Sequence, residues 1–255
     1  MRKYGLLGEG IQYSQSPRIW ARIWQGEGVT DASFELLDTN RLGTVIDQIK
    51  RDDSWQGVMV TTPYKEMVIN YLDDLSDTAK AIGAVNAIRI REGRWTGYNT
   101  DVYGFLYPLR ALTFLNSKAL VLGTGGAAKA VCYGLGSRGF EVDCVSRTHK
   151  DGVLRYDDIT RDTIEDYAIV VNATPLGGPK FPDEAPAIPY DALLSGQVLY
   201  DLSYHTDAPR FLASAPDRCL KINGRTMLYQ QALEAYRIFS DKSSDKSGGY
   251  CNRDI

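Results

Sequence analysis

Polar side chains that could bind a small hydroxylated molecule and exchange a proton with it occur in five places in this sequence. They are the segments 14–17, 61–65, 83–86 and 98–101, and the single residue Gln231 near the end of the chain. Together they supply hydroxyls, amides, one amine at Lys65 and one carboxylate at Asp101. Ligands of open α/β sheets bind beyond the carboxyl ends of the strands. Because the four segments follow expected strands, we predict a site for a small polyhydroxylated ligand, neutral or anionic.

Each of these residues also has a purely structural interpretation. Ser16 and Thr62 precede prolines, which is the pattern of a helix N-cap followed by the first helical position. Asn86 and Asp101 suit turns. A single lysine such as Lys65 is most often solvated. From these residues alone, both interpretations stay open at every position.

A glycine-rich turn forms a second candidate site. Residues 118–122 are typical of a buried strand, residues 123–128 read Gly-Thr-Gly-Gly-Ala-Ala, and a helix is expected to about Arg138. Gly123 would permit the tight turn, and Gly125 would let the backbone approach a pyrophosphate. The helix N-terminus would offer its N–H groups to the phosphates. The order of strand, turn and helix favours dinucleotide binding over the alternative, a tight turn without a ligand.

The residues after the next expected strand, 140–145, indicate which dinucleotide is bound. NAD-binding sites of this type have an acidic residue there, which binds the ribose hydroxyls. The sequence instead reads Ser146-Arg147-Thr148-His149-Lys150, without an acid. Because a 2′-phosphate needs cationic donors, we predict NADP rather than NAD. The alternative is a solvated loop with ordinary surface charges.

The elements that must position these residues are strands alternating with helices. Expected strands are 3–7, 33–37, 57–61, 118–122, 140–145, 168–172 and 197–202, with 219–222 as a further candidate and a hairpin of 84–90 with 94–98 around Glu92-Gly93. Expected helices begin at Ser16 and Thr62 and span about 41–51 and 226–239. This alternation predicts an α/β fold with parallel sheets. A boundary near residue 102 predicts two domains with a cleft between them, where a cofactor could meet a substrate.

Composition excludes several classes of protein. The 255 residues carry a formal charge of −3, with lysine and arginine scattered rather than gathered in a stripe, so nucleic-acid binding is not expected. Four cysteines and two histidines show no zinc-ligand spacing, so no metal is expected. The chain has neither a long apolar run nor a signal peptide pattern, which predicts a cytoplasmic protein with no membrane association. Residues 241–255 are expected to be a disordered tail.

Nine segments, in order, resemble the shikimate dehydrogenase family of NADP-dependent enzymes in aromatic biosynthesis. They are GLLGEGIQYSQSP, VTTPYKE, GAVNAI, GYNTDVYGF, VLGTGGAAKA, SRT, VNATPLG, DLSY and GRTMLYQQA. The resemblance covers about residues 3–239. It implies two domains, an N-terminal α/β substrate domain of residues 1–102 joined by 225–240, and a Rossmann-type NADP-binding domain of 103–224. The final helix would return to the first domain and so bring Gln231 to its site.

The resemblance also implies a role for individual residues. Lys65 matches the catalytic lysine, with Asp101 orienting it and binding a hydroxyl. The residues matching substrate contacts are Ser14, Ser16, Thr61, Asn86, Tyr204 and Gln231. Those matching the cofactor site are Asp77, Gly123, Thr124, Gly125, Gly126, Ala127, Ser146, Arg147, Thr148, Asn172, Ala173, Thr174, Leu202, Gly224 and Met227.

The activity implied is the reversible, NADPH-dependent reduction of 3-dehydroshikimate to shikimate, on the route to chorismate and the aromatic amino acids, with Lys65 as general acid and base. The alternatives are a quinate/shikimate dehydrogenase or related cyclic hydroxy-acid dehydrogenase, and a non-catalytic NADP-binding sensor. The partners expected are small molecules, in a monomer or homodimer. Tyr13, Met59, Ser146 and His205 depart from the family pattern, and none of these departures removes a proposed contact.

Overall fold

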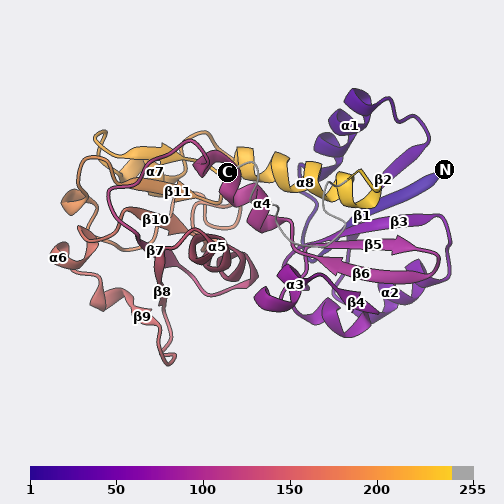
Figure 1. The fold of residues 1–255 in the computed structure, drawn as a ribbon, viewed down its shortest axis with the longest axis horizontal. Helices are drawn as coiled ribbons and strands as arrows, with labels where there is room; N and C mark the ends of the chain where they lie inside the picture. The colour runs from indigo at the N-terminus through magenta and orange to yellow at the C-terminus, as the bar shows by residue number, and fades with distance from the viewer. Residues whose placement is uncertain (243–255) are drawn as a thin grey trace. The chain divides into compact units, whose positions relative to one another are not determined.

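The computed structural model describes residues 1–242, which divide into two compact units (Figure 1). The first unit comprises Met1–Asp101 together with the chain from Tyr229 onward, and the second comprises Val102–Leu228. Each unit contains one six-stranded sheet. The predicted disordered tail, 241–255, lies outside the described residues except for Asp241 and Lys242.

The sheet of the first unit is mixed rather than purely parallel. Its strands are β1 (Arg2–Gly8), β2 (Ala32–Asp38), β3 (Trp55–Val60), β4 (Asp74–Leu75), β5 (Ala87–Arg91) and β6 (Arg94–Tyr98), in the order β2-β1-β3-β5-β6-β4. β1 runs parallel to β2 and β3, whereas β5 is antiparallel to both β3 and β6. The β5–β6 hairpin turns at Glu92 and Gly93, which both have positive φ, as two-residue hairpin turns prefer.

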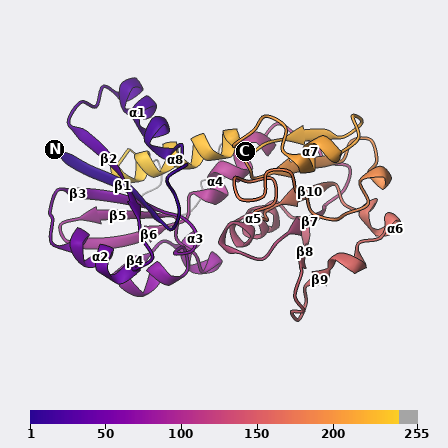
Figure 2. The same ribbon diagram turned by 180° about the vertical axis from the view of Figure 1, so that it is seen from behind.

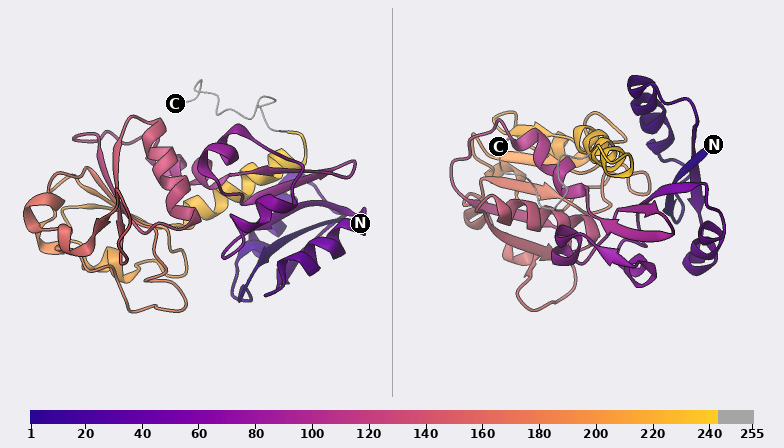
Figure 3. Two further views of the ribbon diagram at one scale, coloured as in Figure 1. Left: turned by 90° about the horizontal axis from the view of Figure 1, so that it is seen from below. Right: turned by 45° about the vertical axis from the view of Figure 1, so that its right-hand side comes forward.

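Helices cover both faces of this sheet (Figures 1 and 3). They are α1 (Ser16–Glu27), α2 (Leu42–Lys50), α3 (Asp77–Ile82) and α8 (Arg225–Phe239), with a short 3-10 helix, η1 (Met67–Tyr71). Trp20 of α1 and Phe239 of α8 stack in the core of one face, and Ile46 of α2 lies in the core of the other. A Cβ atom at Gly57 would lie 2.5 Å from the Phe239 ring, so glycine there lets α8 approach β3. From Tyr229 onward α8 belongs to the first unit, which confirms the predicted return of the last helix.

The predicted helix start at Ser16 is confirmed, whereas the predicted capping role of Ser16 and the predicted helix start at Thr62 are wrong. Ser16 is the first residue of α1 rather than its N-cap, which is Gln15 and forms no side-chain capping bond. No helix begins at Thr62, where the Thr62–Pro63 peptide bond is cis and the chain turns before η1. The backbone of this segment bonds to neighbouring segments instead: the carbonyl of Thr62 accepts from Glu9 N.

The sheet of the second unit is parallel throughout. Its strands are β7 (Lys118–Leu122), β8 (Glu141–Ser146), β9 (Leu154–Arg155), β10 (Ile169–Asn172), β11 (Val198–Asp201) and β12 (Leu220–Ile222). Their spatial order, β9-β8-β7-β10-β11-β12, is the 3-2-1-4-5-6 order of the dinucleotide-binding fold. The predicted Rossmann-type domain is confirmed. In this fold the ligand binds where the strand order reverses, here between β7 and β10.

Helices complete the second unit (Figure 2). They are α4 (Asp101–Leu106), whose first residue closes the first unit, α5 (Gly126–Ser137), α6 (Arg161–Ile164), α7 (Arg210–Ser214), and the 3-10 helices η2 (Tyr107–Leu109), η3 (Tyr156–Asp158) and η4 (Tyr190–Ala192). Val131 of α5 lies in the core on one side of the sheet, and Phe211 of α7 lies in the core on the other.

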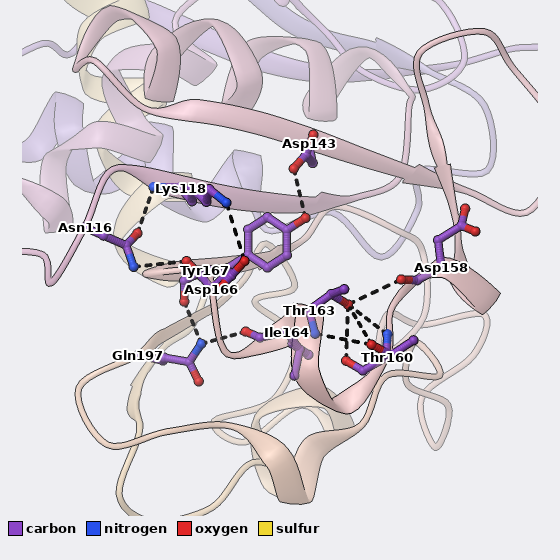
Figure 4. A network of polar contacts seen from close by, with 10 residues as sticks. All are labelled: Asn116, Lys118, Asp143, Asp158, Thr160, Thr163, Ile164, Asp166, Tyr167 and Gln197. Carbon is purple, nitrogen blue, oxygen red and sulfur yellow. Dashed lines mark hydrogen bonds and ion pairs between the residues drawn. The ribbon is translucent and has the colours of Figure 1, made fainter.

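A polar network fixes the amino-terminal edge of this second sheet (Figure 4). The buried amide of Gln197 donates to the carbonyls of Ile164 and Tyr167, at 2.9 and 2.6 Å. The Tyr167 hydroxyl donates to Asp143 of β8 at 2.8 Å, and its burial together with that carboxylate raises the pKa of the phenol. These bonds tie the loop before β10 to its neighbours, at the edge opposite the predicted cofactor site.

Candidate functional site

A buried ion pair lies at the centre of the candidate substrate site in the first unit. The Lys65 ammonium donates to the Asp101 carboxylate at an Nζ–Oδ2 distance of 2.6 Å, and the two side chains are 15% and 8% exposed. Lys65 lies in the turn after β3, and Asp101 follows β6 as the first residue of α4. A pair this close and this buried holds the ammonium in one position, as a proton donor or acceptor requires.

Amide groups surround the carboxylate. The Asn86 amide nitrogen lies 2.9 Å from Asp101 Oδ1 and 2.9 Å from the Thr100 hydroxyl, and the Gln231 side-chain oxygen is 3.4 Å from it. The Asn86 oxygen accepts in turn from the backbone of Thr100 at 2.7 Å. The structure thus brings four predicted residues into one cluster, from the turn after β3, the residue before β5, the start of α4 and α8. Thr100, which lies in the predicted polar segment 98–101 but has no individually predicted role, belongs to it as well.

Backbone bonds explain why these segments meet. The carbonyl of Lys65 accepts from Val85 N at 2.7 Å, which joins the turn after β3 to the segment before β5. The Asn99 side chain spans between Ala84 O and Asp101 N, at 2.9 and 3.2 Å. The ends of β3 and β6 and the start of β5 therefore lie at one edge of the sheet and carry the cluster there.

The two predicted carboxylate-binding serines form a second small group in the first unit. Ser14 Oγ donates to Ser16 Oγ at 3.1 Å and accepts from Ser16 N at 3.2 Å. Their loop is held by Asp38 at the end of β2, whose carboxylate accepts from the backbone of Gly10 at 2.7 Å and of Ile11 at 3.2 Å, and from the side chain of Gln12 at 3.0 Å. Asp38 was not predicted; an acid at a strand end is the only sequence signal for it.

Thr61 follows β3 beside this loop. Its methyl group would lie 2.6 Å from a Cβ at Gly8, and its backbone N–H donates to Leu7 O at 2.9 Å. Asp77, by contrast, begins α3 with a side chain that is 83% exposed and lies 4.0 Å from Lys80. No described contact joins Asp77 to the Lys65 cluster.

The second unit carries the predicted phosphate loop. Gly123 has φ +116°, and a Cβ there would lie 3.1 Å from the carbonyl oxygen of Ala173, so glycine is required. Gly125 is the N-cap of α5 with no side-chain capping bond, and open space surrounds it. Thr124 lies between these two glycines, and Gly126 and Ala127 are the first residues of α5. This geometry fits a pyrophosphate at the start of α5, beside the reversal in strand order.

The loop after β8 fits a 2′-phosphate. β8 ends at Ser146, whose hydroxyl accepts from Thr148 N at 3.2 Å and lies 3.2 Å from the Thr148 hydroxyl. Arg147 is exposed. The Lys150 ammonium donates to the Thr124 hydroxyl at 2.8 Å, which brings a cation to the glycine turn. No acid stands at this strand end, in agreement with NADP rather than NAD.

The loop after β10 is organised by its own side chains. The fully buried Asn172 donates to Asp201 of β11 and to Leu176 O, both at 3.1 Å, and its oxygen accepts from the Thr174 hydroxyl at 2.7 Å. Burial raises the pKa of Asp201 to about 6, although bonds from Ser203 N and Asn172 oppose the shift. The side chains of Asn172 and Thr174 therefore shape the loop that follows Ala173.

The remaining predicted residues also lie in the second unit. Leu202 is half-buried and Met227 is buried in the core beside α5. A Cβ at Gly224 would lie 2.1 Å from Leu202 O, so only glycine fits there. Tyr204, predicted to contact substrate, packs against His205 with the two rings tilted by 37° at a centroid distance of 4.1 Å. Tyr204 thus belongs to a different unit from the other predicted substrate residues.

Residues 1–242 offer neither a metal site nor a membrane-spanning helix. They contain no group of three or more histidine, cysteine, aspartate or glutamate side chains placed to hold a metal ion. Among the same residues, every helix is too short or too polar to cross a membrane.

Comparison with known proteins identifies the family. Residues 6–88 match the shikimate dehydrogenase substrate binding domain. A shikimate dehydrogenase (NADP(+)) of Carboxydothermus hydrogenoformans is 36% identical over 257 residues, covering 94% of this chain and 91% of the relative. The structure is similar to shikimate 5-dehydrogenase from Thermus thermophilus in complex with NADP(H) and shikimate, with a TM-score of 0.83, 31% identity and 97% of each chain covered. It is also similar to a quinate dehydrogenase from Corynebacterium glutamicum in complex with NAD, with a TM-score of 0.82, 25% identity and 94% of each chain covered. The similarity extends along nearly the whole chain, which also has the buried Lys65–Asp101 pair in one unit and the glycine turn in the other. The protein is therefore a member of the shikimate dehydrogenase family.

Proposed function

We propose that this protein catalyses the reversible reduction of 3-dehydroshikimate to shikimate with NADPH, in the biosynthesis of aromatic amino acids. The observation that carries the proposal is the Lys65–Asp101 pair at 2.6 Å, with the amides of Asn86 and Gln231 beside it. An ammonium supplies a proton to a carbonyl oxygen, and the amides can bind ring hydroxyls.

Lys65 acts as the general acid and base. In reduction, its ammonium donates a proton to the oxygen of the reacting carbonyl; in oxidation, the amine accepts the proton from the hydroxyl. NADPH, when bound, supplies the hydride. Asp101 holds the amine in position through Oδ2 and accepts from the Asn86 amide at Oδ1. Because each carboxylate oxygen can accept a second hydrogen bond, Asp101 also accepts one from a substrate hydroxyl.

The substrate carboxylate binds to Ser14 and Ser16, with Tyr204 as a further contact. A pair of hydroxyls 3.1 Å apart, on a loop held by Asp38, suits the two oxygens of a carboxylate. Thr61, Asn86 and Gln231 bind the ring hydroxyls. This assignment leaves Lys65 for the reacting oxygen.

NADP is held by the second unit. The pyrophosphate lies at the glycine turn of residues 123–127, and the 2′-phosphate is bound by Ser146, Arg147 and Thr148. The second unit's part of the cofactor site is completed by Asn172, Ala173, Thr174, Leu202, Gly224 and Met227, and Asp77 of the first unit is a further proposed cofactor contact. The absence of an acid after β8 and the nearby Lys150 support NADP over NAD.

Quinate is the second candidate substrate, favoured by the similarity to a quinate dehydrogenase. An absorbance assay of nicotinamide reduction, with shikimate or quinate crossed with NADP or NAD, separates the candidates. We expect the fastest turnover with shikimate and NADP. Faster turnover with quinate and NAD would favour the second candidate, and turnover with neither substrate would indicate a non-catalytic NADP sensor.

The compartment and the assembly are also part of the proposal. The three cysteines among residues 1–242 are free thiols, as in proteins of reducing compartments, which supports a cytoplasmic enzyme. We propose a monomer or homodimer that binds neither nucleic acid nor membranes. Light scattering after size-exclusion chromatography distinguishes the two assemblies.

A further inference from the structure

Two cysteines of the second unit, which the proposed reaction does not use, lie in contact with each other. Cys132 is on α5 and Cys144 is on β8, and their sulfur atoms are 3.1 Å apart. Both side chains are half-buried and pack against the core between α5 and the sheet. The contact is a hydrogen bond between two free thiols.

The positions of both sulfurs are set by regular secondary structure. Alternate residues of a strand face the same side, so Cys144 faces α5 together with Val142, while Val145 packs in the opposite core. A disulfide has an S–S distance of about 2.05 Å, so the sulfurs need to approach by only about 1 Å. A small shift of α5 toward β8 is enough for that.

The pair also has the electrostatics of a reactive thiol. The hydrogen bond from Cys132 lowers the pKa of the Cys144 thiol, against the opposing effects of burial and of Asp143. The same bond and burial raise the pKa of Cys132. Since the thiolate is the nucleophile, Cys144 attacks first and Cys132 is placed to resolve the product.

We propose that Cys132 and Cys144 form a redox-active dithiol, which hydroperoxides convert to an intramolecular disulfide that weakens NADP binding. Formation of the disulfide is independent of the proposed function, whereas its effect on NADP rests on that function.

The oxidation balances with one peroxide. The Cys144 thiolate attacks a peroxide oxygen, the O–O bond breaks, and a sulfenic acid and hydroxide form; the hydroxide takes a proton and leaves as water. The Cys132 sulfur then attacks the sulfenic sulfur, the S–O bond breaks, and a second water leaves with the thiol proton. Two thiols are oxidised, one hydrogen peroxide is reduced, and two waters are released.

The disulfide would act on the cofactor site through both elements that carry it. Cys132 is on the helix whose start follows Gly125, and Cys144 is two residues before Ser146 on the same face of β8. Drawing α5 and β8 together changes the spacing between the pyrophosphate and 2′-phosphate sites. A misplacement of binding groups by about 1 Å can remove a large part of their binding free energy. We therefore expect KM for NADP to rise about tenfold, with kcat at saturating NADP little changed.

The test uses the full chain with Cys219→Ser and Cys251→Ser, so that only the two proposed cysteines remain. Cys219 is buried, with its thiol directed to Leu194 O, and Cys251 lies outside the described residues. After treatment with hydrogen peroxide and then an alkylating reagent, the intact mass should fall by two hydrogens with no alkylation. Dithiothreitol should restore two alkylatable thiols and the original KM.

Adding Cys132→Ser gives the matched control, in which Cys144 gains oxygen or is alkylated and KM for NADP does not respond reversibly to peroxide. Alkylation of both thiols after peroxide, or oxygen addition in place of a disulfide, overturns the proposal. A disulfide with an unchanged KM overturns its effect on NADP. If the doubly substituted chain does not fold, peptide mapping of the unsubstituted chain for a 132–144 link decides the question in the same way.

Discussion

The two units differ in how firmly they hold the side chains that would do the chemistry. In the first unit, Lys65, Asp101 and Asn86 are bonded to one another and largely buried. In the second, Arg147 and Thr148 are exposed on a loop, and the buried bonds lie beneath the site, between Asn172 and Asp201.

This difference corresponds to what each half of the reaction requires. Proton transfer depends on a fixed distance between an amine and an oxygen, so it needs a site that is organised before the substrate arrives. Phosphates are bound by long cations and backbone N–H groups, which tolerate small adjustments. Disrupting the first unit should therefore reduce turnover, whereas disrupting the surface of the second should reduce affinity for one cofactor.

The largest effect should follow from replacing the proposed proton donor. We expect Lys65→Ala to lower turnover by ~10² or more, because a general acid and base is lost, while shikimate and NADP bind within about tenfold of their original affinity. Steady-state kinetics and binding titrations of the same preparation measure the two quantities.

Lys3→Ala is the matched control, because Lys3 also lies in the first unit and pairs with an aspartate, Asp52, at 2.9 Å, but on the surface. Its turnover should be unchanged. Near-normal turnover in the Lys65 variant would remove this residue from the proposed role and would weaken the contrast between the units.

A smaller and more selective effect is expected in the second unit. Arg147→Ala should weaken NADP about tenfold, through loss of a charged hydrogen bond to the 2′-phosphate, and leave NAD little changed. The measurement is KM for each cofactor with shikimate saturating. Arg161→Ala is the control, since that exposed arginine pairs with Asp191. Equal losses for both cofactors would contradict the 2′-phosphate assignment.

Much of the fold could be predicted because the apolar pattern of each long element is local. The α/β class, the hairpin at Glu92 and the Rossmann-type unit follow from strand lengths, turn residues and order. The two-residue strands β4 and β9 escape prediction because they are too short to show a period. The helix predicted at Thr62 is wrong because backbone bonds to other segments override the local proline signal.

The candidate site could be predicted in part, since polar residues after strands meet at one edge of a sheet. That pattern and the family resemblance together placed Lys65, Asn86, Asp101 and Gln231. The bonds within the cluster depend on tertiary contacts. Neither the hydrogen bond between Asn86 and Thr100 nor the bonds by which Asp38 supports the serine loop can therefore be predicted from the sequence.

Asp38 offers a milder test of organisation in the first unit. Asp38→Ala removes the acceptor for Gly10, Ile11 and Gln12, so the loop that carries Ser14 and Ser16 loses its support. We expect KM for shikimate to rise about fivefold with a smaller change in kcat, because only substrate binding depends on the loop. Asp31→Ala, which removes a surface pair with Arg2, is the control. A loss confined to kcat would mean that the loop acts on Lys65 instead.

The smallest effect on turnover should come from Asp201, which is buried beneath the cofactor loop. Its contribution is best tested through the pH dependence of stability. The pKa of Asp201 is raised by burial to about 6, above its ordinary value of 3.8. Between these two values the folded protein binds more protons at this group than the unfolded chain does, so its contribution to stability falls as pH rises from about 4 to about 6 and is constant above that. Asp52 acts in the opposite sense at lower pH, because bonds from Ser54 and Lys3 lower its pKa to about 2.

Asp201→Asn should lower stability throughout, since an amide can accept from only one of Asn172 and Ser203, and should remove the slope between pH 4 and 6. Urea unfolding of both proteins across this range measures the difference; parallel stability curves would show that Asp201 is ionised in the folded protein throughout, with its charge fully stabilised by those two donors.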